Sequence, residues 1–296
     1  MKLDNSITLK KALARCRTIH EKRCTGLKTS VVSKEYLNLQ KEIISLQERW
    51  KESLGEQSVN IKVDKASLAA GVPVASQAIF DFDIPLFLQW IEELRTLLVK
   101  HNNSMEEKLA FLSKLIDENT AQRWIDEALA FNDMYFSDFA EDHEVEGWIP
   151  HFIAETVLRP YLQLAAEKAQ PSISFGVHGA GCPLCGEPAR LAQLEGEGKK
   201  ELYCPRCLVH WHDKRITCTH CGNDEHDTIK FISVEGDSTS QIQACDKCMG
   251  YIKIVDTRQF IKRPSSAILD LNTLHLDFIA QENGYHTGGG AGQNQQ

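Results

Sequence analysis

Eight of the ten cysteines in this chain form four Cys-x-x-Cys pairs, all between residues 182 and 248. The pairs are Cys182/Cys185, Cys204/Cys207, Cys218/Cys221 and Cys245/Cys248. A two-residue spacer lets both sulfurs of a pair bind one metal ion, and a second pair completes a tetrahedron of ligands. The cysteines therefore predict two metal sites, each with four thiolate ligands.

The lengths of the spacers favour sites that are built from consecutive pairs. Spacers of 18 and 23 residues separate the first pair from the second and the third pair from the fourth. Each spacer can hold one hairpin, as in ribbon or rubredoxin-like modules. The first site would then use the cysteines of 182–207 and the second site those of 218–248. A cross-braced order, which joins the first pair to the third and the second to the fourth, is the alternative.

The ligands alone do not identify the metal or its role. Tetrahedral sulfur ligation suits zinc and a single iron ion alike, and the ligand number would also allow a four-iron cluster. A region of about 90 residues that is split into two small hairpin units has little core, so the ions could serve only to hold it together. Alternatively, the ions could act on a partner protein.

The residue after each pair predicts the shape of the turn there. Gly186 and Gly222 follow the first and third pairs, where a positive φ angle would turn backbone N–H groups toward the sulfurs. Leu208 and Met249 follow the other two pairs. Each site is therefore expected to combine one glycine-closed turn with one less regular turn. This repeated asymmetry suggests that one ribbon unit was duplicated.

The link between the two predicted sites carries Trp211, His212 and Arg215. A tryptophan beside polar or cationic groups forms a core plug, a stacking surface or a recognition patch. These three residues are therefore candidates for recognition of a partner. The region also contains four histidines, which are His210, His212, His220 and His226. They are not needed as metal ligands, because the sulfurs complete both sites.

Residues 1–171 have the three- and four-residue apolar spacing of amphipathic helices. Helices are expected over about 6–19, 33–50, 84–98, 104–116 and 120–129, followed by a pair between Tyr135 and Lys168. Pro85 falls in the first turn of the third helix, and Ser104 with Glu107 forms a capping box for the fourth. The segment 58–78 is expected to be irregular.

After Pro171 the helical spacing ends, and short β-prone runs between turn residues replace it. Strands are expected over 200–203, 229–234, 240–244 and 251–255, followed by an amphipathic helix over 267–282 that docks on another domain. The predicted fold is an N-terminal all-α domain (1–171) followed by two tandem rubredoxin-like or zinc-ribbon-like four-cysteine modules (172–264). A C-terminal docking helix (265–285) and a disordered tail (286–296) complete the chain.

Charge and hydropathy exclude several classes of protein. The net charge is −8, and residues 172–264 contain 12 basic and 12 acidic residues, which argues against a nucleic-acid surface. No apolar run is long enough to span a bilayer, and the first residues contain no secretory or twin-arginine signal. We therefore expect a cytoplasmic protein, in which thiols stay reduced. Cys16 and Cys24 belong to no pair and are expected to be ordinary small side chains.

Several of these motifs occur together in one known family. Cys204-x-x-Cys207 leads into Trp211-His212 and Arg215, and Cys182-Pro-Leu-Cys-Gly stands upstream. The downstream motifs are Asp270-Leu271, Leu276-Asp277 and Gly284-Tyr285. Over residues 180–285 the chain resembles the family of the formate dehydrogenase accessory protein FdhE. Over the helical half the likeness is one of architecture only.

The resemblance implies a cytoplasmic assembly factor that is needed to make active respiratory formate dehydrogenase. It implies that the eight paired cysteines hold two rubredoxin-like iron sites, and that the protein binds the catalytic subunit of the enzyme before export. Trp211, His212 and Arg215 match the inter-site motif of the family, to which no role is assigned. The sequence contains no phosphate-binding glycine loop, Gly-x-Ser-x-Gly or His-Glu-x-x-His motif, so no catalytic residue and no enzymatic activity is predicted.

Three other functions compete with the assembly factor. A rubredoxin-like electron carrier would use iron in the sulfur sites, although a carrier seldom needs a helical domain as long as 1–171. A zinc-ribbon module for nucleic-acid or protein interaction would be expected to carry a basic surface. A thiol–disulfide oxidoreductase would use a single Cys-x-x-Cys motif at a helix start, whereas this chain has four matched pairs.

Overall fold

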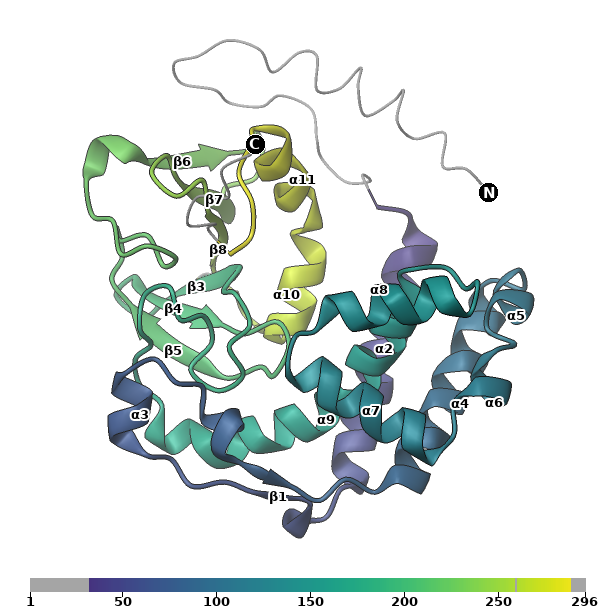
Figure 1. The fold of residues 1–296 in the computed structure, drawn as a ribbon. Helices are drawn as coiled ribbons and strands as arrows, with labels where there is room; N and C mark the ends of the chain where they lie inside the picture. Colours follow the sequence, from purple (N-terminus) through teal and green to yellow (C-terminus); the bar gives the residue numbers. More distant parts are fainter. Residues whose placement is uncertain (1–31, 259, 289–296) are drawn as a thin grey trace, which may run out of the picture. The chain divides into compact units, whose positions relative to one another are not determined.

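The computed structural model describes residues 32–258 and 260–288, which group into two compact units. A helical unit holds residues 38–62 and 77–168, and a sheet unit holds residues 32–37, 63–76 and those from Ala169 onward (Figure 1). The boundary at 168 lies close to the predicted end of the helical domain at 171. Residues 63–76, which we placed in the helical domain, group with the sheet. The limits of the domain, modules, docking helix and tail stay predictions.

The helical unit is built from amphipathic helices joined by short links. Its elements are α2 (Lys34–Ser53, from residue 38 on), β1 (Val59–Asn60), β2 (Ile79–Phe80), α4 (Ile84–His101), α5 (Met105–Lys108), α6 (Leu112–Leu115), α7 (Glu118–Leu129), α8 (Asp133–Asp142) and α9 (Ile149–Ala169). The predicted helices over 33–50, 84–98 and 120–129 and the pair between 135 and 168 are confirmed. The helix predicted over 6–19, together with Cys16 and Cys24, lies outside the described residues. No helix in the described part of the chain combines the length and hydropathy needed to cross a membrane.

The start of α4 agrees with the helix start predicted at Pro85, whereas the predicted capping box of Ser104 and Glu107 does not form. Asp83 is the N-cap of α4, where its carboxylate accepts a hydrogen bond from the Leu86 N–H at 2.9 Å. Ser104 instead donates through both its N–H and its hydroxyl to the Asn102 side-chain oxygen, at 3.1 and 2.9 Å. Because this contact uses the hydroxyl, the side chain of Ser104 does not cap a helix. The expected helix over 104–116 is split into α5 and α6.

Aromatic side chains fill the core of the helical unit. Trp50 of α2 stacks on Trp90 of α4 with ring centroids 5.2 Å apart, and Tyr161 of α9 lies 5.7 Å from Trp90. The Trp50 indole N–H donates to the Glu93 carboxylate at 2.7 Å, so its polar atom is satisfied. Such large buried rings contribute strongly to stability because they remove much apolar area from water.

The sheet unit is organised around one mixed sheet, which within the described residues has six strands in the order β5-β4-β3-β8-β7-β6. The strands are β3 (Leu191–Glu195), β4 (Lys199–Tyr203), β5 (His210–Asp213), β6 (Ile229–Ser233), β7 (Ser240–Cys245) and β8 (Tyr251–Asp256). The four predicted strands correspond to β4, β6, β7 and β8 and are confirmed. Strands β3 and β5 were not predicted. The remaining elements of this unit are α3 (Lys65–Ala69) and 3₁₀ turns at Val74–Gln77, Gln170–Ser172 and His226–Thr228.

The strand order is that of two repeats placed side by side in one sheet. Strands β3-β4-β5 form one antiparallel meander and β6-β7-β8 form a second. The first strand of one repeat pairs in parallel with the last strand of the other, with Leu191 opposite Lys253. The repeats are therefore halves of a continuous sheet rather than two separate modules. The duplication that we inferred from the residues after the cysteine pairs has a direct counterpart in this topology.

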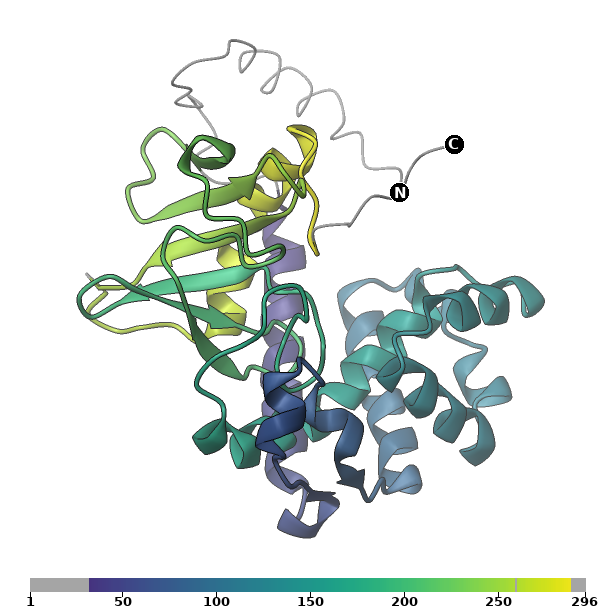
Figure 2. The same cartoon turned by 60° about the vertical axis from the view of Figure 1, so that its left-hand side comes forward.

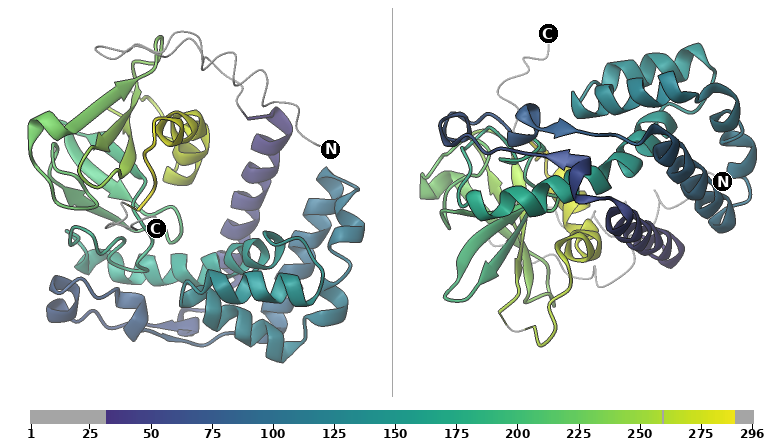
Figure 3. Two further views of the ribbon diagram at one scale, coloured as in Figure 1. Left: turned by 45° about the horizontal axis from the view of Figure 1, so that its top comes forward. Right: turned by 90° about the horizontal axis from the view of Figure 1, so that it is seen from below.

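The C-terminal helix is divided into α10 (Ser266–Asn272) and α11 (Leu274–Glu282). Thr273 separates them, and its hydroxyl donates to the Leu269 carbonyl at 2.8 Å. Both helices lie against one face of the sheet (Figures 2 and 3). Leu276 and Ile279 of α11 pack on β7 and β8, and Leu269 packs on Leu191. The helix was expected to dock on another domain, but it covers the sheet of its own unit.

A buried lysine joins these two helices to the sheet. Lys253 of β8, whose side chain is 0% exposed, lies 2.6 Å from carboxylate oxygens of both Asp270 and Asp277. Tyr251 donates its hydroxyl to Asp277 at 2.9 Å, and Arg190 pairs with Asp270 at 3.2 Å. The acidic residues of the downstream motifs that prompted the family resemblance thus hold α10 and α11 on the sheet.

Candidate functional site

Within the described residues, the sheet unit brings the eight paired cysteines into two groups of four. Cys182, Cys185, Cys204 and Cys207 form the first group, and Cys218, Cys221, Cys245 and Cys248 form the second. The sulfurs of each group lie within 4.8 Å of one another. The grouping follows the sequential order that the spacers favour, and the cross-braced alternative does not occur. Both groups contain cysteine only, so none of the four nearby histidines belongs to them.

Each Cys-x-x-Cys pair lies in a turn, here called a knuckle, and all four knuckles share one backbone hydrogen bond. The N–H of the first cysteine donates to the carbonyl five residues later, at 2.8 to 2.9 Å. The pairs are Cys182 to Glu187, Cys204 to Val209, Cys218 to Asn223 and Cys245 to Gly250. In three knuckles, the residue after the second cysteine also donates its N–H back to the carbonyl of the first cysteine. The knuckles are therefore one structure repeated four times.

The residue after the second cysteine has a positive φ angle in every knuckle. The angles are 80° at Gly186, 67° at Leu208, 74° at Gly222 and 55° at Met249. Our expectation of two regular and two less regular turns was wrong, because Leu208 and Met249 adopt the same left-handed backbone as the glycines. A side chain at such an angle costs about 1–2 kcal/mol. The turn is therefore set by the geometry of the knuckle and not by the presence of glycine.

The separation of the sulfurs fits a tetrahedral metal ion. A metal–sulfur bond of about 2.3 Å gives a tetrahedron with edges of about 3.8 Å. In the first group Cys182–Cys207 and Cys185–Cys204 are each 3.5 Å apart. In the second group Cys218–Cys248 and Cys221–Cys245 are 3.6 and 3.8 Å apart. Zinc and a single iron ion fit this arrangement equally well, since both bind four thiolates.

Electrostatics within the groups also favour a cation. Burial raises the pKa values of the Cys182 and Cys207 thiols well above their usual value. Burial acts in the same direction on Cys204, but hydrogen bonds from the neighbouring thiols and from the Cys207 N–H hold its pKa well below the usual value. A divalent cation at the centre would stabilise all four sulfurs as thiolates. The chemistry of the donors therefore agrees with their geometry.

The two groups differ in their access to solvent. Every cysteine of the first group is buried, with at most 6% of its surface exposed. In the second group Cys218 and Cys245 are buried, Cys248 is partly exposed and Cys221 is exposed. In Cys245, burial is outweighed by hydrogen bonds from backbone N–H groups and from the Asn223 side chain, which lower its pKa to about 7. The second group thus lies at the surface of its unit.

The predicted recognition residues do not form one patch. Trp211 and His212 lie on β5, not on an irregular link, and Arg215 follows the end of that strand. Because side chains of a strand alternate between its two faces, Trp211 and His212 point in opposite directions. Trp211 is 3% exposed, whereas His212 and Arg215 are exposed. Trp211 accordingly belongs to the core of the sheet unit.

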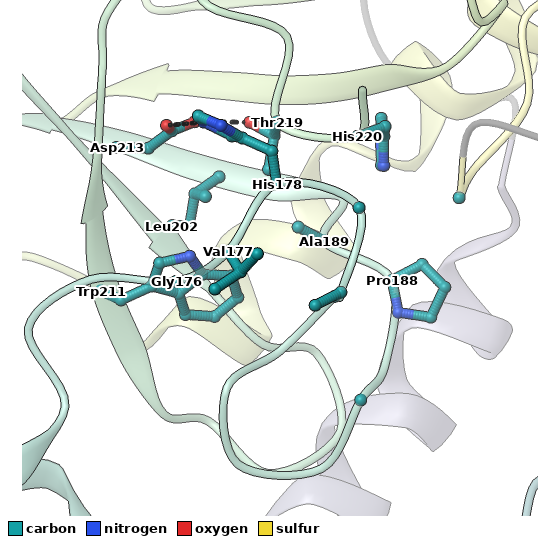
Figure 4. Close-up of a pocket in the computed structure, with 15 residues that line it drawn as sticks. Gly176, Val177, His178, Pro188, Ala189, Leu202, Trp211, Asp213, Thr219 and His220 are labelled. Carbon is teal, nitrogen blue, oxygen red and sulfur yellow. Dashed lines mark hydrogen bonds and ion pairs between the residues drawn. The ribbon is translucent and has the colours of Figure 1, made fainter. Parts of the chain in front are cut away.

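A polar cluster that the sequence did not reveal lies beside a knuckle of the second cysteine group. Asp213, at the end of β5, forms an ion pair with the buried Lys200 of β4 at 2.8 Å. Its carboxylate also accepts a hydrogen bond from the Thr219 hydroxyl at 2.7 Å and lies 3.1 Å from the His178 Nε2 (Figure 4). Burial would raise the pKa of Asp213, but the positive charge of Lys200 holds it below its usual value. No motif marks these residues, because strand pairing brings them together.

A small cavity of about 80 Å³ borders this cluster. The glycine-containing loop 176–181 forms one wall, and Trp211 and Leu202 of the sheet form another (Figure 4). A Cβ atom at Gly176 would lie 2.7 Å from the Trp211 indole nitrogen, so only glycine allows the loop to pack this closely. Three residues further along the loop, the Gly179 N–H donates to the Thr219 carbonyl at 3.4 Å. The loop therefore links Trp211 to a knuckle of the second group.

Comparison with known proteins relates this arrangement to one family. Residues 216–292 match the family described as FdhE, C-terminal domain. A protein named FdhE homolog from Aquifex aeolicus is 29% identical over 242 residues, which cover 79% of this chain and 76% of that protein. The FdhE homolog of Pseudomonas aeruginosa is 31% identical over 114 residues, which cover 35% of this chain and 36% of that protein.

A solved structure agrees with the fold described above. The crystal structure of the FdhE protein from Pseudomonas aeruginosa superposes with a TM-score of 0.59 at 21% sequence identity, covering 85% of this chain and 86% of that one. The match therefore extends well beyond the cysteine groups into the helical unit. Taken with the sequence matches, it shows that this chain is similar to FdhE proteins over most of its length.

Proposed function

We propose that this protein is a non-enzymatic accessory factor for the assembly of respiratory formate dehydrogenase. It would bind the catalytic subunit of that enzyme in the cytoplasm, before export, through or beside two four-cysteine metal sites. The observation that carries this proposal is the pair of cysteine groups, which fit two tetrahedral ions, in a chain that is similar to FdhE proteins over most of its length. That similarity supplies the link to formate dehydrogenase, as the resemblance implied.

Iron is the metal that we propose for both sites, and zinc is the alternative. The sulfur tetrahedra accept either ion, so the choice of iron rests on the rubredoxin-like sites that the family resemblance implies. In such a site the chain supplies the four thiolates, and the N–H groups of Arg206 and Cys207 each donate to the Cys204 sulfur at 3.4 Å. Bound iron would add the capacity for one-electron transfer. Metal analysis of protein prepared without oxygen tests the assignment, and a content of zinc alone would contradict it.

The client interaction requires a separate experiment. A tagged catalytic subunit is used to capture the wild-type protein and the variants Cys221→Ser and Cys204→Ser under reducing conditions. Cys24→Ser is the matched control, because Cys24 belongs to no Cys-x-x-Cys pair. We expect the control to bind like the wild type, and loss of a paired cysteine to weaken capture. Circular dichroism separates unfolding from loss of recognition, and equal capture of all the variants would show that the metal sites do not contribute.

A rubredoxin-like electron carrier is the second candidate function, and one observation favours it. Cys221 of the second group is exposed, so a redox partner could approach that sulfur directly. An electron carrier would show a reversible potential and would be reduced rapidly by its partner. An assembly factor with structural metals would show neither property.

A further inference from the structure

The two cysteine groups can be compared position by position, because their knuckles share one backbone. In the first knuckle of the first group, Pro183 and Leu184 lie between the cysteines. Their carbonyls accept hydrogen bonds from the N–H groups of Val74 and Ala75, at 3.0 and 2.8 Å. Leu184 is 0% exposed. A segment about 110 residues upstream in the chain therefore covers this knuckle, in agreement with its place in the sheet unit.

The equivalent knuckle of the second group is covered less well. Thr219 and His220 take the places of Pro183 and Leu184, and both are partly exposed. The Thr219 carbonyl accepts a longer hydrogen bond, 3.4 Å, from the Gly179 N–H. The His220 Nε2 lies 3.0 Å from the Tyr251 carbonyl, so this side chain is directed inward and does not cover the neighbouring sulfur. The following residue, Cys221, is exposed.

The remaining knuckle of each group shows the same difference. In the first group, Arg206 lies between the cysteines and is buried. In the second group Lys247 occupies the equivalent place and is exposed, as is the preceding Asp246. Cys207 is 0% exposed, whereas Cys248 is partly exposed. Both knuckles of the second group are therefore more open than their counterparts.

We propose that the second group is an exchangeable metal site and that Cys221 is the ligand through which exchange occurs. The first group would retain its ion and hold the sheet together. This inference rests on the metal sites of the proposed function and assigns a different role to each of them. It identifies the class of partner as a soft donor, such as the thiolate of another protein or a sulfur or nitrogen chelator.

Access explains why exchange would begin at this sulfur. An incoming donor must approach the metal before a resident ligand leaves, and a fully buried shell of four cysteines prevents that approach. At the second site, the incoming thiolate would form a metal–sulfur bond as the bond from the metal to Cys221 breaks. The released Cys221 thiolate would then take up a proton from water. The charges balance in this step, and no electron is transferred.

The test uses the full chain loaded with zinc, which is colourless and cannot be oxidised. The coloured chelator 4-(2-pyridylazo)resorcinol is added in excess, and the release of zinc is followed by absorbance. We expect one zinc ion per chain to leave in a first phase and the other to leave at least about ten-fold more slowly. Brief treatment with N-ethylmaleimide followed by peptide mass spectrometry identifies the reactive sulfur, which should be Cys221.

Two equivalent variants and one control complete the experiment. Cys221→Ser should abolish the fast phase and leave the slow phase unchanged. Cys185→Ser, the same position in the first group, should leave the fast phase intact. Cys24→Ser should behave as the wild type. If a variant fails to fold, zinc release and cysteine labelling of the wild-type protein still test the proposal. Release of both zinc ions at one rate would overturn this inference alone, as would N-ethylmaleimide labelling that starts at a cysteine within 182–207. A chain that binds no zinc would overturn the proposed metal sites as well.

Discussion

The buried Lys200 offers a stringent test of how the two repeats are held together. Its side chain is 0% exposed, and its ammonium lies 2.8 Å from the Asp213 carboxylate, 3.0 Å from the Thr217 carbonyl and 3.3 Å from the Gln243 side-chain oxygen. Strand β4 belongs to the first repeat and β7, which carries Gln243, to the second. The ammonium therefore joins both repeats and the link between them. Replacing it by an apolar group should weaken the whole sheet unit.

The substitution Lys200→Met removes the charge and keeps most of the volume of the side chain. Removing one partner of a buried ion pair costs about 3–5 kcal/mol, because the other charge is left without compensation. His178 still lies 3.1 Å from Asp213, so we expect a loss near the lower end, about 3 kcal/mol. With a urea m-value of about 2 kcal/mol/M, the unfolding midpoint should fall by about 1.5 M.

The neighbouring Lys199→Met is the matched control. Lys199 lies on the same strand but is exposed, so its replacement should change the free energy of unfolding by less than about 0.5 kcal/mol. The double variant Lys200→Met/Asp213→Asn should recover part of the loss, because it also removes the uncompensated carboxylate. Urea titrations give the midpoints, and hydrogen exchange of peptides from β3–β4 and β7–β8 assigns the loss to the sheet unit. If Lys200→Met and Lys199→Met unfold at the same midpoint, the ion pair does not stabilise the fold.

Three further predictions concern the knuckles, the metals and pH. Gly222→Ala should destabilise the protein by about 1–2 kcal/mol, because φ is 74° there, whereas Gly147→Ala, in open space, should not. Chelation of the two bound metal ions should remove hydrogen-exchange protection from the sheet unit first and from the helical unit later. Burial would raise the pKa of Asp270, but the charges of Arg190 and Lys253 hold it below its usual value. Asp270→Asn should therefore destabilise the protein at pH 7, where the carboxylate is ionised. The difference in free energy of unfolding between variant and wild type, measured by urea titration, should shrink below about pH 4.

The sequence predicts those parts of the fold that depend on near neighbours in the chain. The first turn of α4 follows from Asp83 and Pro85, and strands such as β8 are rich in β-branched and aromatic residues. The sequential grouping of the cysteines was predictable for a similar reason, because each spacer closes one hairpin. These elements form largely for local reasons, and the structure agrees with them.

Strands β3 and β5 could not be predicted, because their conformation depends on their partners. Strand β3 reads Leu-Ala-Gln-Leu-Glu, contains no β-branched residue and would suit a helix equally well. It is a strand because β4 pairs with it on one side and β8 on the other. Strand β5 contains the Trp211-His212 motif, which we interpreted as a linker. Pairing of Trp211 with Leu202 determines which of these two side chains enters the core.

The difference between the two cysteine groups illustrates the same limit at the level of function. Four Cys-x-x-Cys motifs with similar spacers predict two equivalent sites, and their backbones are equivalent. Exposure depends on contacts from distant residues, and Val74 and Ala75 cover only the first group. Glycine follows both Cys185 and Cys221, and the two Cys-x-x-Cys-Gly motifs differ only in the pair between the cysteines, which is Pro-Leu in the first group and Thr-His in the second. If the exchange experiment finds one fast and one slow site, the two sites differ because the segment that contains Val74 and Ala75 covers only one copy of a duplicated unit.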